Sequence, residues 1–160
     1  MPDKQLKAMI DTNLYERIFK YDLQRILELI GREKILVYGC KTIRDELRNI
    51  PKSVRFEGKS YRGQLLSLYD DLVGKHSFPV ENVAESLAME YWEEYKGGVP
   101  KRKIFPDFLI VSTATIHNLD IIVSGDERTM KSGPAKKAYD IANRNNGFTT
   151  PRFISINELF

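Results

Sequence analysis

Two aspartates follow apolar runs in positions where a carboxylate could do chemistry. Asp11 comes directly after the run Lys7–Ile10, and Asp126 comes just after the segment LDIIVSG. Each therefore lies beyond the carboxyl end of an expected strand, the edge at which functional groups gather in an open parallel sheet. Either position taken alone is more typical of a turn or a helix cap, so a functional role needs support from other residues.

Glu46 supplies part of that support because it is expected on an apolar helix face. It is three residues after Ile43 and four residues before Ile50, so these three side chains share one face, and Asp45 points away. A carboxylate directed toward a core costs several kcal/mol unless it is paired. A salt bridge to a nearby arginine would explain Glu46 if it stood alone.

Asp107 shows the same pattern in a second helix. Ile110 and Val111 follow it by three and four residues, so Asp107 lies in line with an apolar stripe. It is also expected in the first turn of its helix, where the helix dipole favours an acid. That placement would be sufficient to explain Asp107 alone.

The four acids considered together predict a cation site. Carboxylates that converge raise one another's pKa and destabilise the fold, and a divalent cation removes this conflict. Mg²⁺ and Mn²⁺ prefer carboxylate oxygen, and such an ion can activate a water and neutralise charge on a phosphate. The two histidines, His76 and His117, stand in unrelated contexts and are not expected to be ligands.

The pattern along the chain predicts the elements that position these acids. Thr12 and Asn13 are expected N-caps, Thr42 with Asp45 suggests a capping box, and Pro106 suits a first helical turn. Strands separated by helices indicate a parallel sheet covered on both faces. The strands are expected at 7–10, 34–38, 119–123 and 152–156, and the main helices at 22–30, 42–50, 59–73, 81–95, 106–118 and 134–145.

Composition places the chain among ordinary globular proteins and predicts one domain over residues 1–160. Of its 160 residues, 42% are hydrophobic and 29% charged, and no apolar run is long enough for a membrane helix. Cys40 is the only cysteine, which excludes an internal disulfide and a paired-cysteine zinc site. With no secretory signal at the start, the expected location is the cytoplasm. The net charge of +3 permits a nucleic-acid partner without demanding one.

Three segments in this order resemble the PIN-domain nucleases: MIDTN at 9–13, TIRDEL at 42–47, and PDFLIVSTATIHNLDIIVSGD at 106–126. The resemblance implies a three-layer α/β/α fold with a central parallel sheet. It also implies an acidic pocket that holds one or two Mg²⁺ or Mn²⁺ ions and cleaves RNA. The family's metal-binding acids then correspond to Asp11, Glu46, Asp107 and Asp126, with the first three holding the principal ion.

The resemblance also assigns supporting residues and partners. Ser124 matches the family's small hydroxyl residue, and Thr12 and Asn13 would lie in or behind the pocket. Arg128, or a lysine of the 101–103 cluster, would bind a flanking phosphate. Because many relatives are toxins of toxin–antitoxin pairs and many form homodimers, an antitoxin partner and a homodimer are expected.

The chain departs from the pattern between Glu46 and Asp107, where it is longer than the compact toxins. The aromatic residues of this region, Tyr91, Trp92 and Tyr95, are expected to serve as core or dimer contacts.

Two alternatives stay open. One is a PIN-like RNA-binding or scaffold domain without activity. The other is a haloacid-dehalogenase-like phosphatase, which would need an aspartate where Asn13 stands.

Overall fold

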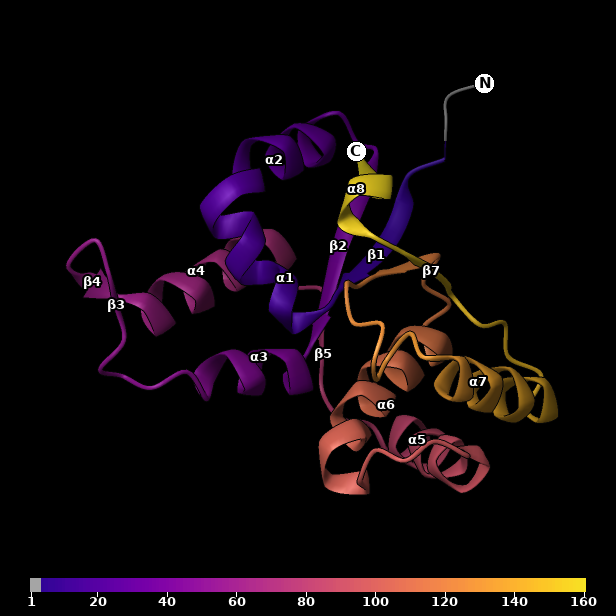
Figure 1. Cartoon of the computed structure of the whole chain (residues 1–160). Coiled ribbons are helices and arrows are strands. Elements are labelled where there is room, and N and C mark those ends of the chain that lie inside the picture. The colour runs from indigo at the N-terminus through magenta and orange to yellow at the C-terminus, as the bar shows by residue number, and fades with distance from the viewer. Residues whose placement is uncertain (1–3) are drawn as a thin grey trace.

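The computed structural model describes residues 4–160 (Figure 1). Strands and helices alternate along most of the chain, with a two-stranded hairpin inserted after the third helix. In chain order the elements are β1 (Leu6–Ile10), α1 (Thr12–Arg17), η1 (Ile18–Asp22, a π-helix), α2 (Leu23–Gly31), β2 (Ile35–Cys40), α3 (Lys41–Arg48), β3 (Arg55–Phe56), β4 (Lys59–Ser60), α4 (Tyr61–Val73), β5 (Ser77–Phe78), α5 (Asn82–Glu94), α6 (Lys101–Ile116), β6 (Ile121–Val123), α7 (Gly133–Asn145), β7 (Arg152–Ile154) and α8 (Ile156–Leu159).

The central sheet is parallel, as the alternation of strands and helices predicts. Its five strands run in the order β5-β2-β1-β6-β7, and each neighbouring pair is parallel. In the central strand β1, Ala8 pairs with Val37 of β2 and with Ile121 of β6. The predicted α/β class is therefore confirmed.

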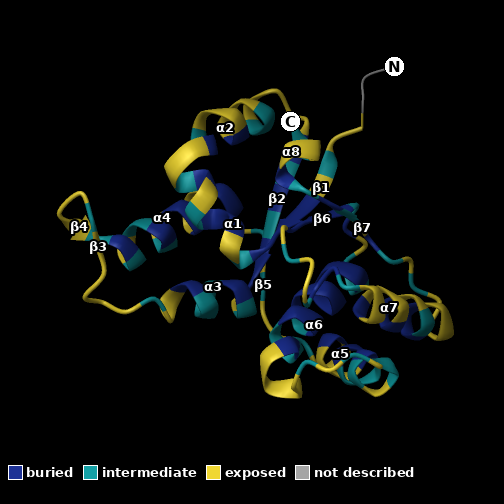
Figure 2. Cartoon of the chain, viewed as in Figure 1, coloured by how far each residue is buried: buried dark blue, intermediate teal, exposed yellow. Residues whose placement is uncertain are grey.

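Helices cover the sheet on two sides. In Figure 1, α1, α2 and α4 lie on one side, and α5, α6 and α7 form a compact group on the other. The side chains between these layers form one core that includes both faces of β1, because Ala8, Met9 and Ile10 are all fully buried (Figure 2). Within residues 4–160 no helix has the length and hydrophobicity required to cross a bilayer.

Four short elements were not predicted from the sequence. These are the strands β3, β4 and β5, of two residues each, and the helix α8, of four residues. A two-residue strand shows no alternation of side chains, so periodicity cannot identify it. The hairpin is closed by Glu57 and Gly58, both at positive φ.

Two predicted helix caps were wrong. Asp11, rather than Thr12 or Asn13, is the N-cap of α1, and its side chain accepts a hydrogen bond from the Thr12 backbone N–H. Helix α3 follows β2 so closely that its N-cap is Cys40 and it has no side-chain cap. Asp45 therefore makes no capping box and forms an ion pair with Lys41 one turn earlier.

The sixth helix begins earlier than predicted. Pro106 lies inside α6, which already starts at Lys101, and Pro100 is its N-cap. Proline in a helix interior costs about 3 kcal/mol through a lost hydrogen bond and a steric clash. The burial of Ile104 and the packing of Phe105 on the core favour helix before the proline and offset this cost. As a result Asp107 is not in the first turn, and the helix dipole does not account for it.

Candidate active site

Asp11 is placed by the end of the central strand. Its backbone N–H donates to the carbonyl of Val123 in β6, which continues the sheet by one residue. Its carboxylate has two partners, the Thr12 N–H and the Ser124 hydroxyl, each at 2.8 Å. Only 4% of the residue is exposed. Burial is the main cause that raises its pKa, and these hydrogen bonds oppose the shift.

Glu46 reaches the same edge from α3. Ile43 and Leu47 of this helix are buried, so Glu46 is held half-buried beside them, as its predicted face requires. The Thr12 hydroxyl donates to Glu46 Oε1 at 2.8 Å. Burial raises the pKa of Glu46, and the charge of Asp11 raises it further. Thr12 is therefore a contact of a candidate acid and does not cap its helix.

Asp107 is a buried acid with a strongly raised pKa. Burial raises its pKa to about 7, and the charges of Asp11, Asp126 and Glu46 add to the shift, while a hydrogen bond with the Thr129 side chain opposes it. No arginine or lysine is among the groups that shift it. A buried carboxyl surrounded by acids fits a site that takes a cation better than a structural ion pair.

Asp126 has a local structural role. Its Oδ1 accepts hydrogen bonds from the backbone N–H groups of Arg128 and Thr129, at 3.1 and 3.0 Å. Its Oδ2 accepts one from the Thr129 hydroxyl. Asp126 thus orders the loop after β6 and is only partly buried. These hydrogen bonds are those of a turn residue, and the charge of Asp126 also acts on Asp107. Its role as a metal ligand stays a prediction.

Two residues that sequence reasoning missed hold this loop. Thr129 lies between Asp126 and Asp107 and interacts with both carboxyl groups. Lys131 is buried, and its ammonium donates to the Ser124 carbonyl at 3.1 Å and pairs with Glu127 at 3.0 Å. A lysine eight residues beyond a strand carries no pattern that would distinguish it from a surface lysine.

Ser124 connects the two ends of the site. Its hydroxyl donates to Asp11 Oδ2 and accepts a hydrogen bond from the Asp126 backbone N–H at 3.1 Å. Each of the four acids is therefore bound to a serine or threonine hydroxyl: Ser124 for Asp11, Thr12 for Glu46, and Thr129 for the other two. The role of Ser124 in binding or catalysis stays a prediction, and these contacts place its hydroxyl on Asp11.

The donor set fits a hard divalent cation in its chemistry. Carboxylate oxygens are the ligands that Mg²⁺ and Mn²⁺ prefer, and the raised pKa values of Asp11, Glu46 and Asp107 show a cluster that a cation would stabilise. Over residues 4–160, however, no group of three or more acidic, histidine or cysteine side chains is arranged to hold a metal ion. The hydroxyl groups, rather than one another, are the nearest partners of these acids.

A surface hollow of about 450 Å³ opens beside the cluster. Asp11 and Asp126 line it together with Asn13 and Arg128, two of the predicted supporting residues, both of which are exposed. Glu127 also lines this hollow, so Arg128 stands beside three acids. An arginine in this position is suited to hold one phosphate group of a chain while the next phosphate lies at the carboxylates. Lys101 and its neighbours begin α6 and are exposed, with the Lys101 ammonium over the ring of Phe105.

Comparisons with known proteins identify the fold. No family model matches the sequence, and no curated protein matches it. VapBC2 from Rickettsia felis, solved with a DNA fragment from its promoter, is similar over 94% of this chain and 98% of that chain, with 14% identity and a TM-score of 0.62. FitAcB from Neisseria gonorrhoeae is similar over 92% and 96%, with 15% identity and a TM-score of 0.56. FitAB bound to an IR36 DNA fragment is similar over 92% and 94%, with 15% identity and a TM-score of 0.57.

These complexes contain PIN-domain proteins, and the chain shares their fold over almost its whole length. The predicted PIN-like α/β/α architecture is therefore confirmed. At 14–15% identity the likeness concerns the fold, and the activity has to be argued from the site.

Proposed function

We propose that this chain is a metal-dependent endoribonuclease that hydrolyses RNA phosphodiester bonds at the cluster of Asp11, Glu46, Asp107 and Asp126. One observation carries the proposal. Four acids come from four separate segments, and burial together with the charges of the other three raises the pKa of Asp107 without a compensating basic residue. Such an arrangement destabilises a fold and is typical of functional sites.

Asp11, Glu46 and Asp107 would hold the principal Mg²⁺ or Mn²⁺, with Asp126 assisting or holding a second ion. When bound, the ion would supply an activated water and stabilise charge on the phosphate. Ser124 and Thr12 fix the orientation of Asp11 and Glu46 through their hydrogen bonds. At least one of these acids would exchange a hydroxyl partner for the cation.

RNA as substrate follows from the sequence resemblance and from Arg128 at the rim of the hollow. The resemblance also suggests that the chain is the toxin of a toxin–antitoxin pair and forms a homodimer. An antitoxin partner is consistent with the similar structures, which are complexes.

The decisive experiment compares two neighbouring substitutions on α3. Glu46→Gln removes an acid of the cluster. Asp45→Asn removes the neighbouring acid, which is partly exposed and pairs with Lys41. We expect Glu46→Gln to lower the Mn²⁺-dependent cleavage of single-stranded RNA by at least about 100-fold, in the range that removal of electrostatic stabilisation causes. Asp45→Asn should stay within about twofold of the unchanged protein.

The same measurement tests the alternative that the chain is a scaffold domain without nuclease activity. This alternative is favoured by the hydrogen bonds that each of the four acids already makes with a serine or threonine hydroxyl. Equal cleavage by the two variants and the unchanged protein would show that any activity is independent of this cluster. RNA binding with no cleavage in the presence of Mn²⁺ or Mg²⁺ would support the scaffold.

A further inference from the structure

The segment from residue 48 to 62, which we call the hairpin arm, carries a concentrated positive charge. It comprises the end of α3, the β3–β4 hairpin and the start of α4, and it projects from the body of the molecule (Figure 1). Five basic residues and one acid give it a net charge of +4, whereas the whole chain has +3, so the other residues together carry −1. The basic residues are Arg48, Lys52, Arg55, Lys59 and Arg62.

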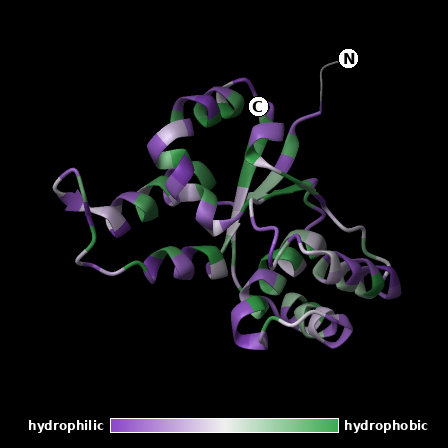
Figure 3. Cartoon of the chain, viewed as in Figure 1, coloured by the Kyte–Doolittle hydropathy of each residue, from purple (hydrophilic) through white to green (hydrophobic). Residues whose placement is uncertain are grey.

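These cations are available to a partner. Within the described part of the chain none of the five forms an ion pair, and four of them are exposed. Arg62 is half-buried and donates to the Arg48 carbonyl at 3.4 Å. Figure 3 shows both hydrophilic and hydrophobic residues in the hairpin arm. Val54 adds an exposed apolar side chain, at 39%.

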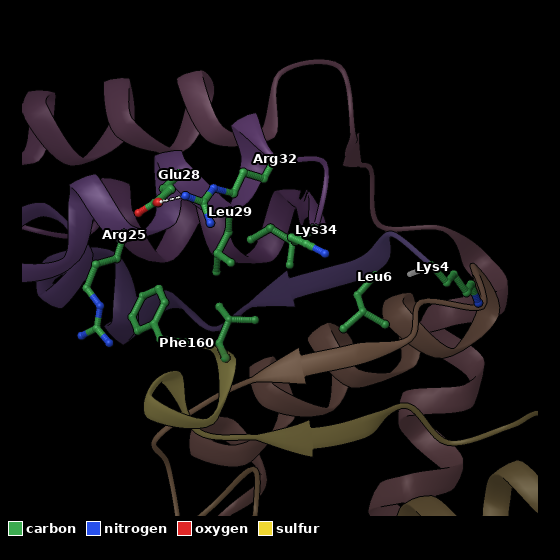
Figure 4. A pocket seen from close by; sticks show the side chains of 10 residues that line it. Lys4, Leu6, Arg25, Glu28, Leu29, Arg32, Lys34 and Phe160 are labelled. Atoms are coloured by element: carbon green, nitrogen blue, oxygen red, sulfur yellow. Dashed lines mark ion pairs between the residues drawn. The ribbon is translucent and has the colours of Figure 1, made fainter. Parts of the chain in front are cut away.

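A second basic region of the molecule makes a useful contrast. Near the chain's C-terminus, Arg25 and Arg32 line a hollow (Figure 4). Arg32 is paired with Glu28 at 2.7 Å, and the Arg25 guanidinium lies 4.0 Å from the centre of the Phe160 ring. Both of these cations have partners within the fold. What distinguishes the basic residues of the hairpin arm is that, among the described residues, they form no ion pairs.

A continuous surface joins the hairpin arm to the candidate active site. Asn13 lines the hollow beside Asp11 and also a second hollow of about 520 Å³, which continues past Glu16 and Arg17 to Lys20 and Tyr21. Arg17 is paired with Asp22 at 3.1 Å, so Lys20 is the cation of this hollow without an ion pair among the described residues. The Lys20 ammonium then lies over the rings of Phe56, in the hairpin, and of Tyr61, at 5.7 and 5.2 Å. The path from carboxylate to hairpin arm is therefore lined by adjoining residues.

We propose that the hairpin arm binds the backbone phosphates of a single-stranded RNA whose scissile bond lies at the carboxylate cluster. This proposal rests on the proposed function. Unpaired cations bind phosphates without reading sequence. Tyr21, 79% exposed between the site and the arm, offers a ring on which a base can stack. The exposed ring of Tyr21 beside Lys20 fits single-stranded nucleic acid better than an acidic polypeptide, which has no bases to stack.

The test measures binding without cleavage. In the Glu46→Gln background and in EDTA, fluorescein-labelled 12-residue oligouridylate is titrated over a range of salt concentrations. The triple variant Lys52→Ala, Arg55→Ala, Lys59→Ala should weaken binding about tenfold. It should also reduce the slope of log Kd against log salt by about 2, as expected for three lost phosphate contacts on a single strand.

The control removes the same charge elsewhere. Lys75→Ala, Lys96→Ala, Lys137→Ala changes three exposed lysines outside the hairpin arm. It should weaken binding less than threefold and leave the slope unchanged. Equal losses in the two triple variants would overturn the proposal, because binding would then follow net charge alone. Competition by polyglutamate as effective as that by oligouridylate would overturn the assignment to RNA.

The outcome is separable from that of the proposed function. If the unchanged protein cleaves RNA and the hairpin-arm variant binds normally, the nuclease stands and the hairpin-arm proposal fails. If no variant and no metal gives cleavage but the hairpin arm still determines binding, the RNA surface stands and the nuclease proposal fails.

Discussion

Ionised Asp107 lowers the stability of the fold that holds it. It is nearly buried, and the charges nearest to it are other acids. Asp11 and Glu46 have raised pKa values for the same two reasons, burial and mutual repulsion. Hydroxyl groups of Ser124, Thr12 and Thr129 relieve part of this cost, but they bring no positive charge.

The free energy of unfolding should therefore fall as pH rises in metal-free protein. Unfolded Asp107 releases its proton near its ordinary pKa of 3.8, while folded Asp107 retains it until about 7. The stability associated with the neutral form is complete below pH 4 and is lost as pH rises toward 7. The loss is at most roughly 4 kcal/mol for a shift of this size.

Asp107→Asn should reduce this dependence to the part due to Asp11 and Glu46 and make the metal-free protein more stable at pH 8. Urea unfolding in EDTA at several pH values between 5 and 8 measures the effect. Asp140→Asn, at an exposed site on α7, is the control and should keep the original slope. If Asp107→Asn is less stable than the unchanged protein at pH 8, the Asp107 carboxylate does not destabilise the metal-free fold.

At the scale of elements, one tyrosine joins α4 to two strands. The Tyr69 hydroxyl donates to the Cys40 carbonyl of β2 at 3.2 Å and lies 2.6 Å from the Ser77 hydroxyl of β5. The ring crosses β2 directly over Gly39, where any side chain would overlap it. The edge strand β5 is only two residues long, so this contact adds substantially to its attachment.

Gly39→Ala should destabilise the protein by about 1–3 kcal/mol, because overpacking displaces Tyr69. Thermal and urea unfolding measure it. Gly133→Ala, where a methyl group meets open space at the start of α7, is the control and should have no destabilising effect. Combining Gly39→Ala with Tyr69→Leu should give a smaller loss than the sum of the single changes; strict additivity would show that the ring is not responsible.

At the scale of the whole molecule, the fold separates two kinds of surface. The carboxylates gather where β1, β2 and β6 end, and the unpaired basic residues gather on the hairpin arm that α3 and α4 carry away from that edge (Figure 1). A modest net charge of +3 therefore conceals strong local charges of both signs. This distribution suits a partner that carries phosphates and requires a cation at the reacting bond.

Binding of Mn²⁺ should stabilise the whole fold if the acids hold it. At a concentration about 100 times its Kd, the gain would be about 2.7 kcal/mol, or roughly 5–10 °C in Tm for a chain of this size. Asp107→Asn should raise Tm in EDTA and lose most of the response to Mn²⁺, whereas Asp45→Asn should respond fully. Identical Mn²⁺ responses in all three proteins would place metal binding elsewhere.

The sequence by itself determined the fold class and the candidate acids. Long apolar runs and helical spacings identified the central strands and the large helices, because periodicity is a local property. The helical face shared by Glu46 and Ile43 was also readable, and the structure confirms that this face is turned inward. The elements that were missed are those too short to show a period.

The tertiary structure decided what surrounds each acid. Several features depend on contacts between segments that are separated in the chain. They are the hydroxyl partners Thr12 and Thr129, the buried Lys131, and the fit of Tyr69 over Gly39. No local pattern encodes such contacts. The charges of residues 48–62 can be read from the sequence. Whether they form ion pairs, and how they connect to the acids through Asn13 and Lys20, is decided only when the chain folds.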